Sequence, residues 1–178
     1  MTSLVVRPWR LDDAISLLTA FASEDLNNQG GPLTSELEAR EWIERWHSGR
    51  GAGDAAAFAI TVDDVPVGGV ALSEIEHRHD TAWMSYWLSE FTRGLGLASR
   101  ATVTVAAYGF EELGLFRLEL GHRVNHPKSC KVATRAGFIT EGIERSKLRY
   151  DDERFDVETH SRLATDPAPD IEALPLTS

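Results

Sequence analysis

The chain has 178 residues, enough for about one domain with its own core, and 42% of them are hydrophobic and 26% charged. These values and a mean hydropathy of −0.24 exclude wholesale disorder, collagen and a coiled coil. Acidic residues outnumber basic ones 28 to 18, so the formal charge of −10 disfavours a nucleic-acid partner while allowing a local basic pocket for one small anion.

The cysteine content and the first residues of the chain bear on the cellular compartment of the protein. Cys130 is the single cysteine, which excludes an internal disulfide framework and favours a reducing environment. The first ten residues lack the apolar run of a signal peptide, and no stretch has the about 18 apolar residues of a membrane span. We therefore expect a cytoplasmic protein with no membrane partner.

The first third of the chain mixes short apolar runs with turn-forming residues. A strand is expected where an apolar run stops at a proline, and helices where apolar residues recur at i, i+3 and i+4. Asparagine, glycine and proline in sequence indicate a loop. In order, we expect a strand over Leu4–Arg7, a helix over Leu11–Phe21, a loop over 27–32, and a helix from Thr34 or Ser35 to the glycines that begin at Gly49.

The middle of the chain predicts a three-stranded meander, a glycine-rich loop and an apolar helix. The two turns of this meander are Asp63-Asp64 and the polar segment His77–Asp80. The elements are strands over Ala57–Val62, Val65–Ile75 and Thr81–Leu88, a loop over Arg93–Ala98 and a helix over Ser99–Leu113.

The last third predicts strands around one short helix, followed by a tail. The elements are strands over Arg117–Val124, Phe138–Glu144, Lys147–Tyr150 and Phe155–Leu163, and a helix over Pro127–Arg135. From Thr165 onward, prolines without periodicity indicate a segment outside the core, so we expect one domain over 1–166 and a proline-rich tail over 167–178. This order predicts a mixed α/β (α+β) fold with a largely antiparallel sheet and one crossover.

The loop Arg93-Gly94-Leu95-Gly96-Leu97-Ala98 carries the functional prediction. The first amides of a helix have no internal partner, and the helix dipole adds about half a positive charge, so such a loop binds an anion, most often a pyrophosphate. Arg93 can add a charge-assisted contact to a phosphate. A tight strand-to-helix turn is the alternative, and the loop lacks the third glycine of a Rossmann site and the lysine of a Walker loop.

At this loop the sequence resembles the Gcn5-related N-acetyltransferase (GNAT) superfamily, whose pyrophosphate loop reads Gln/Arg-x-x-Gly-x-Gly/Ala. Arg93, Gly96 and Ala98 match its fixed positions. It is similar in particular to the ribosomal-protein N-terminal acetyltransferase (RimJ/RimL-like) branch, and the resemblance covers Leu4 to Asp166. The branch motifs appear in order as Arg7-Pro8, Tyr86-Trp87-Leu88, Ser129, Gly137-Phe138 and Glu141-Gly142.

The resemblance implies the GNAT fold, a mostly antiparallel sheet of about seven strands flanked by about four helices and splayed at the strand ending Tyr86-Trp87-Leu88. It implies an acyl-CoA-dependent N-acyltransferase, most simply an acetyltransferase, that moves the acyl group from acetyl-CoA directly to a primary amine. The acceptor is a protein N-terminus or a small amine. The cofactor-binding residues that it implies are Trp87, Leu88, Arg93, Gly94, Leu95, Gly96, Leu97, Ala98, Ser99, Asn125 and His126.

Two residues are implied as catalytic. Glu90 follows Tyr-Trp-Leu-x, where the similar enzymes place the base that accepts the amine proton, and Ser129 would protonate the departing thiolate. A backbone amide near Leu88 would stabilise the oxyanion. The alternatives are a solvated turn residue for Glu90 and a helix N-cap for Ser129.

The sequence departs from the family pattern at several positions. His126 stands where the family asparagine is expected, with Asn125 beside it, and is a substitute donor, an extra base or a plain surface histidine. Trp83 and Ser85 replace a glutamate and a glycine, which suggests a more aromatic acceptor pocket, or core or dimer packing for Trp83. The remaining acidic candidates, rivals of Glu90 or the lining of a pocket for a cationic acceptor, are Glu24, Asp25, Glu74 and Glu76.

We expect no metal, because His77-x-His79 has no third ligand nearby, and we interpret Cys130 as a buried inert thiol. Three other functions fit parts of the pattern: transfer of a larger acyl group such as succinyl, a non-catalytic acyl-CoA-binding regulator, and a nucleotide-binding structural protein. A homodimer is possible, since many relatives form dimers.

Overall fold

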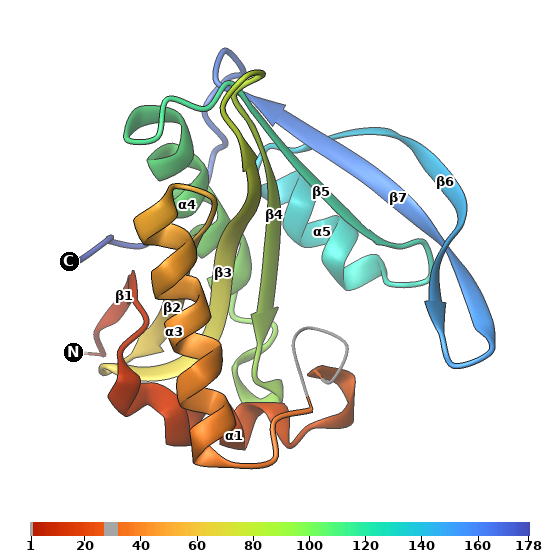
Figure 1. Ribbon diagram of the computed structural model, residues 1–178. Coiled ribbons are helices and arrows are strands. Elements are labelled where there is room, and N and C mark those ends of the chain that lie inside the picture. The colour runs from red at the N-terminus through yellow and green to blue at the C-terminus, as the bar shows by residue number, and fades with distance from the viewer. Residues whose placement is uncertain (1, 27–31) are drawn as a thin grey trace.

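The computed structural model describes residues 2–26 and 32–178, and most of the loop expected over 27–32 lies outside the described residues (Figure 1). Within these residues seven strands form one sheet in the order β1-β2-β3-β4-β5-β7-β6. Neighbouring strands are antiparallel except β4 and β5, which are parallel, so the predicted mixed sheet is confirmed. The strands are β1 Leu4–Pro8, β2 Ala56–Val62, β3 Val65–Glu76, β4 Thr81–Leu88, β5 Arg117–Arg123, β6 Ile139–Tyr150 and β7 Glu153–Leu163.

Four α-helices flank this sheet in the described part of the chain. They are α1 Ala14–Phe21, α3 Glu36–Ala52, α4 Leu97–Glu111 and α5 Pro127–Arg135, with short 3-10 turns η1 Leu11–Asp13, η2 Glu24–Leu26 and η3 Glu90–Thr92. The expectation that the glycine run starting at Gly49 ends α3 is confirmed, because the helix runs on to Ala52 and ends at the last glycine of the run, Gly53, whose φ is +81°. A glycine inside a helix costs about 1 kcal/mol, whereas the left-handed backbone at Gly53 stops it.

The helices form two layers, and each layer encloses a core. α1 and α3 cover one face of β2 to β4, where an aromatic cluster includes Trp9, Phe21 and Trp42 (Figure 1). α4 and α5 lie on the opposite face, over the larger core that includes Phe58 and Leu72. The sheet is therefore sandwiched where β2, β3 and β4 lie, and this sandwich supports the strand on which the functional prediction rests.

The predicted strands Phe138–Glu144 and Lys147–Tyr150 are parts of one strand, β6. The β6–β7 register shifts between Glu144 and Leu148, and Ser146 in this bulge has a φ of +51°. The Ser146 amide donates to Asp156 Oδ1 at 2.7 Å, so the bulge satisfies its own backbone. The two strands form the long twisted hairpin at the edge of the molecule (Figure 1).

The expectation that the segment after Thr165 lies outside the core is wrong. Leu174 is 2% exposed and belongs to the larger core. The Val6 amide donates to Pro175 O at 2.8 Å and the Thr177 amide donates to Val6 O at 2.9 Å, so this segment bonds to β1. Proline removes donors but leaves carbonyls able to accept, which is why proline content did not prevent the packing. The division into 1–166 and 167–178 itself stays a prediction.

No helix among the described residues combines the length and the apolar character needed to cross a bilayer.

Candidate active site

The candidate site lies where β4 and β5 part. The two parallel strands pair at three positions, from Thr81 to Trp83 on β4, and then diverge (Figure 1). Beyond Trp83, β4 remains paired with β3 down to Leu88, while β5 pairs with β7. The splay predicted at the strand ending Tyr86-Trp87-Leu88 is confirmed, and the side of β4 that faces β5 is a free edge there.

The backbone groups on this free edge follow from strand alternation. The Ser89 amide donates to Val67 O at 2.8 Å, so it points toward β3, and the groups of Trp87 point the same way. Those of Tyr86 and Leu88 consequently face the opening. The Leu88 carbonyl already accepts from Arg93 Nε at 3.0 Å and Nη2 at 2.9 Å. The Leu88 amide and both backbone groups of Tyr86 have no strand partner among the residues that the structure describes.

The glycine-rich loop follows directly and turns into α4. Gly94 and Gly96 have φ values of +85° and +77°, which favour glycine, and Gly96 is the N-cap of α4. The Arg100 amide, bonded to Gly96 O at 3.1 Å, is the first that the helix satisfies internally. The amides of Leu97, Ala98 and Ser99 have no acceptor among the described residues. They form a cluster of donors at the positive end of a 15-residue helix.

The side chain of Arg93 has contacts that the sequence did not indicate. Besides holding the Leu88 carbonyl, its Nη2 forms an ion pair with Asp25 Oδ2 at 2.6 Å. A hydrogen bond from Ser23, and then the pairing with Arg93, lowers the pKa of Asp25. The guanidinium thus ties the end of β4 to η2, and the phosphate contact expected of it stays a prediction.

The opposite side of the opening is formed by α5. Ser129 Oγ lies 2.8 Å from His126 Nδ1, and His126 is the N-cap of α5. The Tyr86 hydroxyl donates to Ser129 O at 2.9 Å and so bridges β4 and α5. Burial, followed by the charge of Arg123, lowers the pKa of His126, which favours its neutral ring. Burial also raises the pKa of Tyr86, so its hydroxyl keeps its proton.

The remaining predicted residues lie in different surroundings. Glu90 is exposed in η3, two residues beyond Leu88, and its carboxylate has no hydrogen-bond partner in the described part of the chain. Asn125 is exposed and, within the same residues, also lacks a side-chain partner. Leu95 is 69% exposed, whereas Leu97, Ala98 and Ser99 are buried. The structure therefore brings Ser129 and His126 together but leaves Glu90 and Asn125 in solvent.

The rival acidic residues lie at the other end of β4. Glu76 pairs with Thr81, whereas Gly68 pairs with Leu88, so Glu76 and Leu88 are separated by roughly 20 Å of strand. The Glu76 carboxylate accepts the amides of Arg78 and His79 at 2.7 and 3.0 Å and closes the turn over 77–80. The structure thus gives no support to the pocket suggested for Glu74 and Glu76, and the side chain of Glu24 is outside the described residues.

Trp83 lies on the face opposite α5. Lys147 Nζ lies over its ring at 5.4 Å from the centroid, and Trp83 lines a hollow of about 210 Å³ together with Arg117 and Glu141. Arg117 pairs there with both Glu119 and Glu141. Trp83 therefore packs against charged side chains rather than in the core, and its place in an acceptor pocket stays a prediction.

The Tyr86 hydroxyl is the functional group that sequence reasoning missed. Tyr86 was cited as part of a strand motif but was given no role for its side chain. Its alternation with the buried Met84 and Leu88 indicates that the three share a face, and a buried tyrosine hydroxyl needs a partner. This signal could have suggested a contact across the opening, although not the identity of the acceptor.

Comparison with known proteins agrees with this geometry. Residues 3–139 match the family described as "Acetyltransferase (GNAT) domain". The chain is 32% identical over 131 residues to the "Ribosomal-protein-serine acetyltransferase" of Escherichia coli (strain K12), covering 74% of this chain and 73% of the relative. It is 34% identical over 85 residues to the "Spermidine N(1)-acetyltransferase" of the same strain, covering 48% of this chain and 46% of the relative.

A solved structure shares the fold. It is described as "RimL- Ribosomal L7/L12 alpha-N-protein acetyltransferase in complex with Coenzyme A", and it superposes with a TM-score of 0.82 at 21% identity over 90% of this chain and 94% of that one. The chain belongs to the GNAT acetyltransferase family. It is an N-acetyltransferase, an enzyme that moves an acetyl group from acetyl-CoA to an amine.

Proposed function

We propose that the protein acetylates the α-amine of protein N-termini, with acetyl-CoA held in the opening between β4 and β5. One observation carries the donor side of this proposal: the free backbone edge at Tyr86 and Leu88 runs directly into the unpaired amides at the start of α4. The extended pantetheine of acetyl-CoA could pair with the free backbone edge, and its pyrophosphate could bind the amides at the start of α4. This arrangement would direct the thioester towards Ser129.

The proposed chemistry assigns one task to each group. The amine nitrogen attacks the thioester carbonyl, and the carbon–sulfur bond breaks as the amide forms. The Leu88 amide donates to the oxyanion, which develops on the carbonyl oxygen. Glu90, directly or through water, accepts the amine proton, and its exposure suits it to a base that meets a protein acceptor.

Ser129 is proposed to give its proton to the departing CoA thiolate and to regain one, through water, from Glu90, which has taken the proton of the amine. The contact of Ser129 with His126 permits either ring tautomer. When His126 carries the proton on Nδ1, it donates to Ser129 Oγ and leaves the serine proton for the thiolate. The lowered pKa of His126 keeps the ring neutral, so it does not add a charge beside the thioester.

The acceptor class is supported by the relatives and not by an acidic pocket. The E. coli ribosomal-protein-serine acetyltransferase matches over 131 residues, and the spermidine acetyltransferase over 85. Of the carboxylates suggested for a cationic amine whose side chains the structure describes, Glu74 and Glu76 lie at the far end of β4 and Asp25 is paired with Arg93. A protein N-terminus is therefore the first candidate, and a small amine is the alternative.

The proposal is tested by release of CoA thiol from the full chain supplied with acetyl-CoA and a panel of acceptors. We expect turnover with peptides that carry a free N-terminal serine, none with the same peptides blocked at the N-terminus, and weaker turnover with spermidine. A preference for spermidine, or for succinyl-CoA over acetyl-CoA, would overturn the proposed substrates.

The assigned residues are tested in the same assay. Ser129→Ala and Glu90→Gln should each lower kcat about a hundredfold or more while leaving CoA affinity unchanged. Their matched controls are Ser48→Ala on α3 and Glu111→Gln at the end of α4, two exposed positions away from the opening. Wild-type rates in Ser129→Ala or Glu90→Gln would remove that residue from the mechanism. A cytoplasmic location, a homodimer and the lack of a nucleic-acid partner stay predictions.

A further inference from the structure

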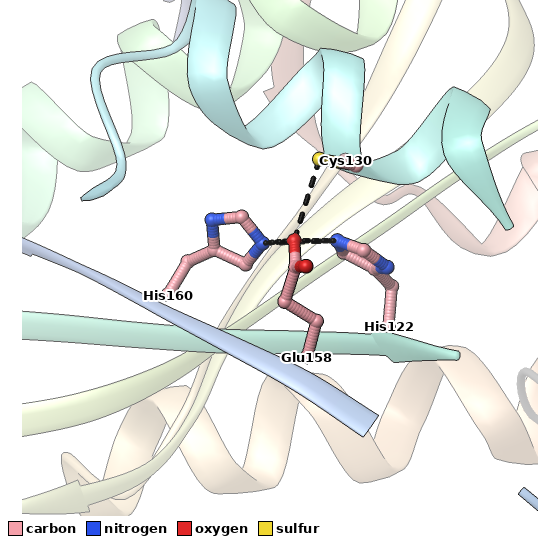
Figure 2. A group of neighbouring side chains, drawn as sticks. All are labelled: His122, Cys130, Glu158 and His160. Carbon is pink, nitrogen blue, oxygen red and sulfur yellow. Dashed lines mark hydrogen bonds and ion pairs between the residues drawn. The ribbon is translucent and has the colours of Figure 1, made fainter. Parts of the chain in front are cut away.

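Four side chains that the proposed mechanism does not use converge beneath α5. They are His122 on β5, Glu158 and His160 on β7, and Cys130 on α5 (Figure 2). One donor atom from each lies within 4.8 Å of each of the others. His160 is 1% exposed and His122 8% exposed, whereas Cys130 and Glu158 are partly exposed, so the two histidines are buried and the group is open to solvent on one side.

The fold fixes three of these residues before any ligand is considered. His122 pairs with Glu158 across β5 and β7, and His160 lies two residues further along β7, so all three side chains project from one face of the sheet. Cys130 reaches the group from the helix that packs on this face. The paired ladder and the overlying helix therefore fix where the four side chains start, and the contacts among the side chains come in addition.

The donor atoms lie near one another on the scale of a small tetrahedral site. His122 Nε2 and His160 Nε2 are 2.9 Å apart, and both face the Glu158 carboxylate, whose Oε1 lies 3.5 and 2.9 Å from them. Cys130 Sγ is 3.4 Å from the same oxygen. Metal–ligand bonds of about 2.0–2.3 Å in a tetrahedron place neighbouring ligands roughly 3.3–3.6 Å apart, so the two longer separations already match and the two shorter ones would widen by about 0.4 Å on binding.

The outer contacts of the two histidines orient their lone pairs inward. His122 Nδ1 lies 3.0 Å from Arg123 O, and a carbonyl can only accept, so Nδ1 carries the hydrogen and the neutral ring presents a lone pair at Nε2. His160 Nδ1 lies 3.3 Å from Thr140 Oγ1, a hydroxyl that can accept in the same way. Two Nε2 lone pairs facing each other repel unless a proton or a cation lies between them. Histidines that bind a metal have this pattern of outer hydrogen bonds.

We propose that His122, Cys130, Glu158 and His160 bind one Zn²⁺ ion. Two imidazole nitrogens, a thiolate and a carboxylate form a ligand set that suits Zn²⁺, and the thiol proton passes to solvent on binding. The ion ties α5 to β5 and β7, and so holds the helix that carries Ser129. This inference departs from the expectation of no metal, and it does not depend on the acceptor or on the proposed catalytic roles.

The alternative to a bound Zn²⁺ ion is a hydrogen-bonded network, in which the Cys130 thiol donates to Glu158 and one histidine donates to the other. Isothermal titration of the chelator-treated full chain with Zn²⁺ alone distinguishes the two. We expect one Zn²⁺ bound per chain. Stoichiometry well below one would overturn the proposal in favour of the hydrogen-bonded network.

Substitutions that keep the size of the side chain test whether these residues bind Zn²⁺ without leaving a cavity in the core. Cys130→Ser and Glu158→Gln keep the shape of each side chain, and each should weaken Zn²⁺ binding by more than about tenfold, since even losing an outer contact costs about that much. The matched control is His79→Gln, an exposed histidine in the turn between β3 and β4, which should bind Zn²⁺ as the wild type does. Equal affinity in the wild type, Cys130→Ser and Glu158→Gln would overturn the proposal.

Co²⁺ provides a readout of the thiolate itself. The wild type loaded with Co²⁺ should show the visible absorption of a tetrahedral site and a thiolate-to-cobalt charge-transfer band. Cys130→Ser should lose the charge-transfer band while its far-ultraviolet circular dichroism stays unchanged. A wild-type spectrum typical of octahedral Co²⁺ would contradict the site.

Discussion

The two walls of the opening between β4 and β5 are held by different kinds of contact. On the β4 wall, Trp87 stacks on Trp9 with ring centroids 6.0 Å apart and meets Phe21 edge-on at 5.0 Å. On the α5 wall, the helix is held by the Tyr86 hydroxyl and by the buried group that contains His122 and His160. Apolar packing is strong and tolerant of direction, whereas polar contacts are directional. Aromatic packing thus supports one face of the wall proposed to bind the donor, whereas the wall with Ser129 adds directional polar contacts to the apolar packing of Ala133 and Val132.

The largest loss of stability is expected from truncating the aromatic side chain that supports the β4 wall. Trp87→Ala removes a ring that contacts two other aromatic side chains, and because Trp87 is partly exposed we expect a loss of about 3 kcal/mol of unfolding free energy, at the low end for such truncations. Urea denaturation measures this loss. Trp46→Ala is the control, since that partly exposed ring meets Trp42 alone among the described aromatic rings. Equal losses in both variants would show that the wall does not depend on Trp87.

The second effect comes from adding one methyl group on β3, beside the β4 wall, and is compared with one methyl group added on the β6–β7 hairpin. At Gly68 a Cβ would lie 2.5 Å from the Trp87 carbonyl oxygen, which is backbone and cannot move aside freely. Gly68→Ala should therefore cost about 1–3 kcal/mol of unfolding free energy. At Gly142, on β6, a Cβ would meet nothing within 4 Å, and Gly142→Ala should stay within about 0.5 kcal/mol of wild type. A larger loss at Gly142 than at Gly68 would reverse the comparison.

A smaller effect is expected from the bond that joins the walls. Tyr86→Phe removes the hydroxyl that donates to Ser129 O and should lower the unfolding free energy by about 1 kcal/mol. Because the bond positions α5, kcat should fall too. Tyr108→Phe is the control, since its hydroxyl has no hydrogen-bond partner in the part of the chain that the structure describes. Indistinguishable stability of Tyr86→Phe and Tyr108→Phe would contradict a bridging role.

The smallest effect is a pH-dependent change in stability. It comes from Glu141, on the face of the sheet opposite α5. Arg117, followed by Ser161, lowers the pKa of Glu141 from 4.5 to about 2. A lowered pKa gives stability that is present above pH 4.5 and is lost as the pH falls towards 2. The difference in Tm between wild type and Glu141→Gln should thus be small near pH 6 and vanish near pH 2. A difference that persists at pH 2 would show that the pair with Arg117 is not its source.

Most of the fold could be predicted because the relevant signals are local. Apolar runs bounded by the turns at Asp63-Asp64 and 77–80 located β2, β3 and β4, and the glycine-rich loop located the strand-to-helix turn in which Gly94 and Gly96 have positive φ values. The glycine run located the end of α3 but not which glycine ends it, because Gly49 and Gly51 keep the helical backbone and Gly53 does not. The sequence predicts a break between two strands where β6 has a bulge, since Ser146 gives no sign that Asp156 will satisfy its amide.

The candidate site was predictable in part for the same reason. The free edge and the donor cluster follow from the chain order around β4, and His126 and Ser129 are three residues apart in one helix. The ion pair of Arg93 with Asp25 and the convergence of His122 with His160 depend on register and packing between distant segments. No spacing along the chain encodes either of these contacts.

The segment that bonds to β1 gives the sheet a protected margin. β1 is a terminal strand of the sheet, and a parallel bridge joins Val6 to Leu176 on its outer side. An uncovered strand margin is a template for another chain. Shortening the chain to residue 166 would remove this cover and the buried Leu174 together, exchanging an intramolecular contact for a surface prone to self-association. The last dozen residues thus cover the margin of β1 and also contribute Leu174 to the core.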